Sequence, residues 1–280
     1  MAKWALFFQV SRSGYYAYLE RYERQAKAKA KIKELIKKIF DESGKTYGPD
    51  RICGVLRRIG CKASYRKISR LMAEMGLSSI HNRHRTRSLT DSRKSRGSGY
   101  LNLVIDQLFN MPYQALCSDI TYLKSGEGWL YLCNVKDIVT GEILGHAMSE
   151  TMRKELVIQA FLNAQARHNL PRGTIFHSDR GSQYTSKAFM ETLKRYGIRQ
   201  SFSRVGMPGD NAWAESFFAT LKKECIHFKQ FSTREALKQT VFSWIESFYN
   251  NRRVQARLGY LSPREYAILL SSNSQQRKAA

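Results

Sequence analysis

The sequence has no closely spaced pair of cysteines and no long run of apolar residues. Its five cysteines are scattered without a Cys-x-x-Cys pair, which argues against a zinc knuckle or a disulfide framework and fits a reducing compartment. The first apolar run, residues 4–8, is too short for the core of a signal peptide and far too short to cross a bilayer. We therefore expect a cytoplasmic protein with no membrane anchor.

Acidic residues are scarce relative to basic ones. The 280-residue chain has 47 Lys and Arg against 23 Asp and Glu, a formal net charge of +24. Residues 1–112 contain 24 basic and 9 acidic residues and so carry +15 of that total. Such a charge repels itself unless a polyanion shares it, and nucleic acid is the commonest polyanion. Composition alone does not separate a DNA enzyme from a ribosomal or generic basic protein.

Helical periodicity dominates residues 31–80. Apolar residues recur at helical spacing in residues 31–40 and 47–60, and again after Ser64, which we expect to cap a third helix that Gly76 ends. Short helices joined by a tight turn suggest a helix-turn-helix. The outward face of its second helix would carry the residues that read DNA, namely Tyr65, Arg66, Ser69 and Arg70. The alternative is a small helical bundle whose basic face is merely solvated.

The second half of the chain reads as strands followed by alternating helices and strands. Residues 115–123 and 129–139 predict a hairpin, and residues 143–150 predict a third strand. Helices and strands then alternate to residue 203. These patterns predict an α/β fold, a mixed five-stranded sheet flanked by helices, preceded by the small all-α domain. A further helix follows, which Asp210 is placed to cap.

Three acidic residues stand apart from the others. Asp119 lies in the middle of a predicted strand, where Asp is disfavoured unless a ligand or hydrogen bonds compensate. Asp179 ends the fourth strand, and Glu215 lies among apolar or small residues. If the first and fourth strands are neighbours, Asp119 and Asp179 lie side by side, and the helix carrying Glu215 can pack across their ends. Taken singly, most strand-end Asp residues only cap turns.

Converging carboxylates repel one another and raise each other's pKa unless divalent cations neutralise them. Oxygen ligands without His or Cys favour Mg²⁺ or Mn²⁺ over zinc, and two such ions suit phosphodiester chemistry. Arg180 is then placed to meet a phosphate. Lys222 follows Glu215 by seven residues, falls on nearly the same helical face and is expected to contact DNA. Alone, Lys222 would pass for an ordinary exposed lysine.

Several longer strings resemble a known family. These strings are SDITY, HSDRGSQYTS, GMPGDNAWAESFFATLKKE and YNNRRVQARLGYLSPREY. Together with the spacing of 35 residues between Asp179 and Glu215, they resemble the OrfB-type transposases of insertion-sequence family three, within the retroviral-integrase-like superfamily. Residues 47–77 resemble their helix-turn-helix segment, and similarity runs from about residue 10 to residue 267. Leu116, where many relatives have Trp, and Gln255, where they usually have His, depart from the pattern and leave the acids intact.

The resemblance implies a ribonuclease H-like core in which Asp119, Asp179 and Glu215 form a catalytic triad with two Mg²⁺ or Mn²⁺ ions. It implies metal-dependent DNA cleavage and strand transfer at insertion-sequence ends, without a covalent enzyme intermediate. The DNA partners would be terminal inverted repeats and target DNA, and family members are commonly fused to an upstream helix-turn-helix partner. Because two ends are cut in concert, we expect a homo-oligomer on DNA.

The expected organisation has five segments. They are a basic N-terminal segment (1–30), the helix-turn-helix-like domain (31–80), a basic linker (81–112), the integrase catalytic core (113–228) and a C-terminal helical extension (229–280). Two other functions stay open at this point. One is a catalytically silent DNA-binding accessory or regulatory subunit that needs an upstream partner, although a pure binder needs no triad. The other is a nuclease that cleaves but never joins, although it needs no separate sequence reader.

Overall fold

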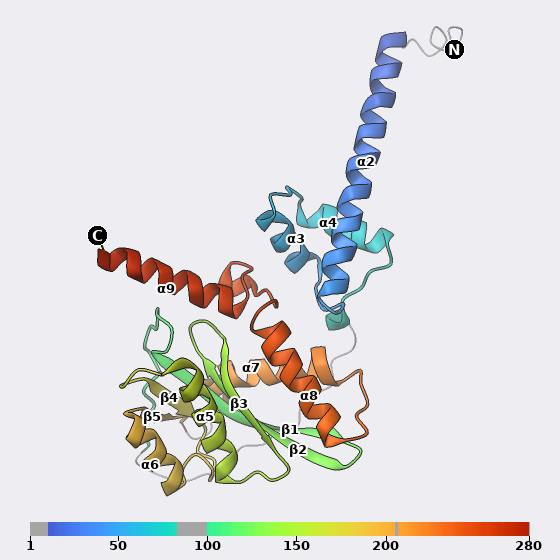
Figure 1. Ribbon diagram of the computed structural model, residues 1–280. Helices are drawn as coiled ribbons and strands as arrows, with labels where there is room; N and C mark the ends of the chain where they lie inside the picture. The colour runs from blue at the N-terminus through green and yellow to red at the C-terminus, as the bar shows by residue number, and fades with distance from the viewer. Residues whose placement is uncertain (1–10, 83–99, 205–206, 280) are drawn as a thin grey trace. The chain divides into compact units, whose positions relative to one another are not determined.

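The structure, a computed structural model, describes residues 11–82, 100–204 and 207–279. The chain divides into two compact units, Met1–His84 and Arg85–Ala280 (Figure 1). A large part of the linker predicted at residues 81–112 falls at 83–99, outside the described residues. Along the described chain, no helix combines the length and the apolar character needed to span a membrane.

Residues 11–82 of the first unit form the helices α2 (Arg12–Glu42), α3 (Pro49–Arg58) and α4 (Tyr65–Glu74) and the short 3-10 turn η1 (Ile80–Asn82). The three helices contact one another and share a core of buried side chains that includes Ile36, Phe40, Ile52, Leu56, Ile68 and Leu71. The cap predicted at Ser64 is confirmed, because its side chain accepts a hydrogen bond from the Lys67 backbone N–H at 3.3 Å. Gly76 follows α4 with φ +65°, a left-handed conformation that glycine tolerates best.

The second unit is built on one five-stranded sheet, as the sequence predicts. Its strands are β1 (Ala115–Ser125), β2 (Gly128–Asp137), β3 (Ile143–Ser149), β4 (Ile175–Ser178) and β5 (Arg199–Phe202). They lie in the order β3-β2-β1-β4-β5. The β1–β2 and β2–β3 pairs are antiparallel, whereas β1–β4 and β4–β5 are parallel. The predicted mixed sheet is therefore confirmed.

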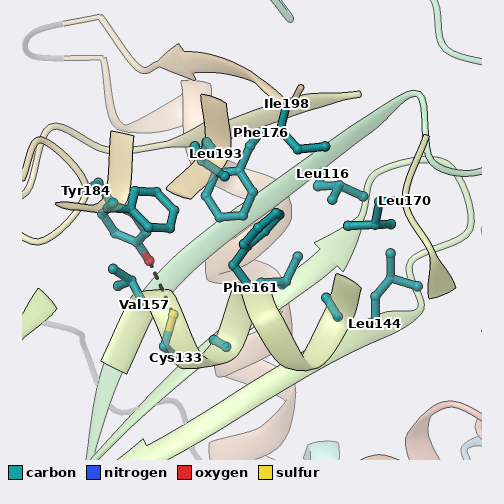
Figure 2. Packing of buried hydrophobic residues seen from close by; sticks show 14 of the residues in the cluster. Leu116, Cys133, Leu144, Val157, Phe161, Leu170, Phe176, Tyr184, Leu193 and Ile198 are labelled. Atoms are coloured by element: carbon teal, nitrogen blue, oxygen red, sulfur yellow. Dashed lines mark hydrogen bonds between the residues drawn. The ribbon is translucent and has the colours of Figure 1, made fainter. Parts of the chain in front are cut away.

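Helices cover both faces of this sheet. On one face, α5 (Lys154–His168) and α6 (Lys187–Tyr196) pack on the apolar cluster drawn in Figure 2, in which Phe161 of α5 lies against Phe176 of β4. On the other face, α7 (Ala212–Leu221) and α8 (Arg234–Ser243) pack on a second apolar cluster that includes Leu130 and Leu132 of β2.

Several shorter elements connect and complete these helices. The 3-10 segments η2 (Pro208–Asn211) and η5 (Ala256–Leu258) precede α7 and α9 (Pro263–Ala279), and the π-helical segments η3 (Lys222–Ile226) and η4 (Trp244–Tyr249) prolong α7 and α8. The prediction that Asp210 caps α7 is wrong, because the N-cap is Asn211, which makes no side-chain cap bond. The Asp210 carboxylate instead pairs with Arg204 and accepts a hydrogen bond from Asn102.

Candidate active site

The register between β1 and β4 brings two of the predicted acids together. The strands pair in parallel with Cys117 opposite His177. Two residues further along each chain come Asp119 and Asp179, so the same register, continued past the end of β4 at Ser178, sets them opposite each other. The prediction that the first and fourth strands are neighbours is confirmed.

The face of β1 that carries Asp119 is the one covered by α7. Side chains alternate along a strand, so Asp119 shares a face with Cys117, which packs against Ala214 of α7. Glu215 is the next residue, in the first turn of α7, and its side chain is exposed. The strand and the helix thus bring the third acid to the same region of the sheet.

Electrostatics shows that the three acids share one local field. Burial, together with the carboxylates of Asp179 and Glu215, raises the pKa of Asp119 to about 7, although a hydrogen bond from the Ile120 N–H at 2.8 Å and the charge of Lys222 oppose the shift. Unpaired negative charge in a partly buried place favours the protonated carboxyl. Of the three acids, Asp119 therefore has the carboxylate that the surrounding protein groups stabilise least.

The Asp179 carboxylate accepts a hydrogen bond within the turn that follows β4. Burial raises the pKa of Asp179, and a hydrogen bond from the Gly181 N–H at 3.0 Å opposes that shift. The side chain keeps contact with solvent, so we take the effect of burial to be smaller at Asp179 than at Asp119. A Cβ on Gly181 would lie 3.0 Å from the Asp179 Oδ1 atom, which explains a glycine at this point of the turn.

Lys222 lies close to the acids, at the end of α7. Burial lowers the pKa of its ammonium group, and the Asp119 carboxylate opposes that shift. The Nζ atom lies 5.1 Å from the centre of the Tyr122 ring. Lys222 thus belongs to the same electrostatic neighbourhood as Asp119.

The other predicted DNA contacts are Arg180 in the second unit and four residues of α4 in the first. The Arg180 Nε donates to the Ser203 carbonyl at 2.9 Å, and its guanidinium lies 5.5 Å from the centre of the Tyr100 ring. In the first unit, the predicted contacts lie on α4, three of them exposed and Ser69 half-buried: Tyr65, Arg66, Ser69 and Arg70. Their contact with DNA stays a prediction.

Sequence reasoning missed three buried polar residues on the α7 side of the sheet. Asn134 is fully buried on β2 directly opposite Asp119, and neither polar atom of its side chain has a hydrogen-bond partner. Lys136, also on β2, donates from Nζ to the Trp213 carbonyl of α7 at 2.6 Å. The available signal was a pair of polar residues inside the apolar string WLYLCNVKDIV.

The third missed residue, His177, joins β4 to the start of α7. Its Nδ1 atom lies 2.9 Å from the Ser201 hydroxyl, and its Nε2 atom lies 3.0 Å from the Asp210 carbonyl. Burial lowers the pKa of His177 to about 4, so the ring is neutral near pH 7. A neutral ring that donates from Nε2 to the carbonyl can accept the hydroxyl proton at Nδ1, which satisfies both nitrogens.

The donor chemistry of the acids fits a hard divalent cation. Across residues 11–82, 100–204 and 207–279, no group of three or more His, Cys, Asp or Glu side chains is gathered closely enough to hold a metal ion. Asp119 and Asp179 nevertheless offer carboxylate oxygens whose mutual repulsion a cation would relieve, and Asn134 adds an amide oxygen without a partner.

Comparisons with protein families match nearly all of the described chain. The profile of the "Integrase core domain" family matches residues 110–208, and a second family of the same description matches residues 215–268. The profile described as "HTH-like domain" matches residues 27–85. These matches cover both the sheet with its acids and the helices of the first unit.

Individual relatives are similar over most of their length. The chain is 37% identical over 237 residues to the transposase for insertion sequence element IS904 of Lactococcus lactis subsp. lactis (strain IL1403), which covers 84% of this chain and 92% of that protein. It is 34% identical over 263 residues to transposase InsF for insertion sequence IS3A of Escherichia coli (strain K12), covering 92% and 90%.

A solved structure supports the fold. A chain of the cryo-EM structure of the simian T-cell lymphotropic virus intasome in complex with PP2A regulatory subunit B56 gamma superposes with a TM-score of 0.50 at 15% identity. The match covers 79% of this chain and 74% of that chain. At this identity the likeness concerns the fold alone.

Proposed function

The chain belongs to the insertion-sequence transposases of the IS3 family, proteins with an integrase core and an HTH-like domain, and on that premise we propose that Asp119, Asp179 and Glu215 are its catalytic triad. DNA transposition and integration is the function of this family, and its chemistry is polynucleotidyl transfer. The observation that supports the triad is the β1–β4 register, which sets Asp119 opposite Asp179 beneath α7, the helix that carries Glu215.

The proposed triad would hold two divalent cations, Mg²⁺ or Mn²⁺. When bound, such ions activate the attacking oxygen and stabilise the oxygen that leaves the phosphodiester. For this, Asp119 must give up the proton that its raised pKa favours. The ammonium group of Lys222 interacts with the Asp119 carboxylate, and in this proposal it meets a phosphate oxygen of the reacting strand.

Two buried side chains would keep Glu215 over the sheet. Lys136 holds the Trp213 carbonyl and approaches the Ser216 hydroxyl at 3.5 Å, so its contacts flank Glu215 on both sides. His177 holds the Asp210 carbonyl just before α7. A side chain positioned to within a fraction of an ångström is what metal-dependent phosphoryl chemistry requires of its ligands.

The remaining partners follow from the family. We propose that α4 reads the terminal inverted repeats through Tyr65, Arg66, Ser69 and Arg70, and that Arg180 contacts the DNA backbone. Two transposon ends must be cut in concert, which requires at least two copies of the chain on DNA. An upstream helix-turn-helix product would add end recognition.

Strand cleavage and joining test this function directly. Purified protein is incubated with a labelled duplex that carries the end of its own element, with Mg²⁺, with Mn²⁺ or with EDTA. We expect metal-dependent nicking and joined products, lost in Asp179→Asn and in Glu215→Gln. Glu191→Gln, which changes an exposed glutamate of α6 that pairs only loosely with Lys187 at 3.8 Å, is the matched control and should cut normally.

The same assay separates the alternatives. Binding without cleavage under every metal condition would favour the catalytically silent accessory subunit, and the assay would be repeated with the upstream product fused. Cleavage without joined products would favour the nuclease. Normal cleavage by Asp179→Asn would refute the triad.

A further inference from the structure

The β1–β2 hairpin carries two exposed aromatic rings. Tyr122 of β1 is 51% exposed and Trp129 of β2 is 48% exposed. The rings meet edge to face with their centres 5.1 Å apart. In the ladder, Tyr122 pairs with Tyr131 and Trp129 pairs with Lys124, so these four side chains share one face of the hairpin. Large rings that remain exposed side by side mark a surface for a partner.

This aromatic pair lies where the sheet is open. β4 is four residues long and pairs with β1 only from Ala115 to Cys117. Further along β1, no strand in the described chain pairs with that edge. Tyr122 follows this opening by a few residues, so a long ligand can approach it without meeting another strand.

Lys222 connects the rings to the proposed active site. Its ammonium nitrogen lies 5.1 Å from the centre of the Tyr122 ring, and its charge is felt by Asp119. Asp119 and Tyr122 are three residues apart on β1, about 10 Å at about 3.3 Å per residue, and their side chains leave opposite faces of the strand. Lys222 interacts with both, so a DNA strand that runs from Asp119 to the rings would pass over the open edge of β1 beside Lys222.

The charge around the rings suits a nucleic acid. Lys124 is exposed and directly opposite Trp129, and Lys222 covers Tyr122. The nearest acid in the turn, Glu127, already accepts a hydrogen bond from the Arg234 backbone N–H at 2.8 Å. Aromatic faces next to lysines are the combination with which proteins hold single-stranded DNA.

We propose that Tyr122 and Trp129 form a stacking platform for an unpaired base of the DNA strand whose phosphate lies at Asp119, Asp179 and Glu215. Bases inside a duplex are already stacked on their neighbours, so the platform favours DNA with an unpaired end. Lys124 and Lys222 contact the adjoining phosphates. The placement of the platform rests on the proposed function, whereas its affinity for unpaired bases does not.

Binding without metal tests the platform apart from cleavage. The full chain is titrated in EDTA against fluorescein-labelled duplexes of one sequence, either blunt or with a 3′ overhang of four thymidines, and anisotropy is recorded. Trp129→Ala and Tyr122→Leu should weaken binding of the overhang DNA about tenfold and leave blunt DNA within about twofold. Trp129→Phe and Tyr122→Phe keep a π-face and should bind nearly as the wild type does.

Phe242→Ala is the matched control, because Phe242 of α8 is also 48% exposed but contacts His146 rather than a lysine. Equal losses for blunt and overhang DNA, no loss for either, or the same loss in Phe242→Ala would overturn the platform. So would normal DNA binding by Trp129→Ala together with a smaller assembly in sedimentation, which would assign the rings to self-association.

The outcomes also separate the platform from the proposed function. If Trp129→Ala loses only overhang binding while the wild type neither cuts nor joins DNA, the platform stands and the proposed function fails. If the wild type cuts and joins while Trp129→Ala binds both duplexes normally, the proposed function stands and the platform fails.

Discussion

The two faces of the central sheet use the same strands for different purposes. Toward α5 and α6, β1, β2 and β4 present mainly apolar or small buried side chains, among them Leu116, Cys133 and Phe176 (Figure 2). Toward α7, the alternate positions of the same strands present Asp119, Asn134, Lys136 and His177. The first face supplies stability through burial of apolar area, whereas the second combines an apolar cluster beneath α7 and α8 with buried polar groups, whose burial is costly. The difference teaches that a single residue step along a strand separates folding from chemistry.

The largest expected effect is at β1, where one substitution on each face of the strand tests the comparison. Asp119→Asn should reduce cleavage to background while the protein stays folded and binds DNA. Leu116→Ala, three residues earlier on the opposite face, should instead lower the free energy of unfolding by about 2–5 kcal/mol and leave cleavage per folded molecule intact. Urea unfolding measures the stability of both variants, and a nicking assay measures their cleavage. The division between the two faces would be refuted if both variants lost stability alone or both lost cleavage alone.

The second prediction sharpens the comparison at neighbouring residues of β4. Phe176→Ala should cost about 3–5 kcal/mol of unfolding free energy because it empties a fully buried ring site. His177→Ala should cost about 1–3 kcal/mol and slow cleavage, because the start of α7 loses its tie to the sheet. Thermal melts report the two losses of stability, and a nicking assay reports the rate of cleavage per folded molecule. A slower reaction in Phe176→Ala, measured per folded molecule, would contradict the division between the faces.

The third prediction concerns pH. The pKa of Asp119 is about 7 in the folded chain against 3.8 ordinarily, so the folded state keeps a proton that the unfolded state loses between about pH 4 and 7. Stability from this group therefore falls as pH rises through that window. At pH 8, Asp119→Asn should have a higher free energy of unfolding than the wild type, by at most about 4 kcal/mol at about 1.4 kcal/mol per pH unit, and should melt at a higher temperature. This difference in stability should disappear toward pH 4.

Added Mn²⁺ provides the control for the pH effect. It should raise the melting temperature of the wild type at pH 8 more than that of Asp119→Asn, because the cation neutralises the carboxylates that repel one another. A melting difference between the two proteins that does not vary with pH would argue against the raised pKa.

The smallest expected effect is at Asn134. Its amide is buried without a partner, so Asn134→Leu, of similar size, should stabilise the cation-free protein by about 1 kcal/mol. If the amide helps to accommodate the cation beside Asp119, the same change should weaken Mn²⁺ binding in calorimetry. Val135→Leu, the next residue on the apolar face, serves as control and should leave Mn²⁺ binding unchanged.

Much of this arrangement follows from local patterns in the sequence. Runs rich in β-branched and aromatic residues within residues 115–150 predicted the three-strand meander. The proximity of Asp119 and Asp179 was predicted only on condition that the first and fourth strands are neighbours, which the strand order confirms. The cap at Ser64 was also readable, since it acts on the Lys67 N–H three residues away. Signals of this kind involve neighbours in the sequence or a regular register.

The features that escaped sequence reasoning depend on distant partners or on exposed chain. Asp210 has the position of a helix cap, but its partner Asn102 is 108 residues away. α2 begins at Arg12, upstream of the periodic stretch at 31–40 and across the segment boundary set at residue 30, and its first half is exposed. Such a helix leaves no apolar stripe to detect. Lys222 begins a π-helical segment, which periodicity does not distinguish from the α-helix before it.

The apolar face of the sheet also affects which amino-acid substitutions this sequence can tolerate during evolution. Contacts between hydrocarbon side chains are not directional, so volume can be exchanged among neighbours at a cost of about 1.5 kcal/mol or less. Leu116 lies fully buried on that tolerant face. His177 and Lys136 hold particular carbonyls in particular directions, and no exchange of volume can replace them. Amino-acid substitutions should therefore accumulate among the buried residues beneath α5 and α6 and be rare among those beneath α7.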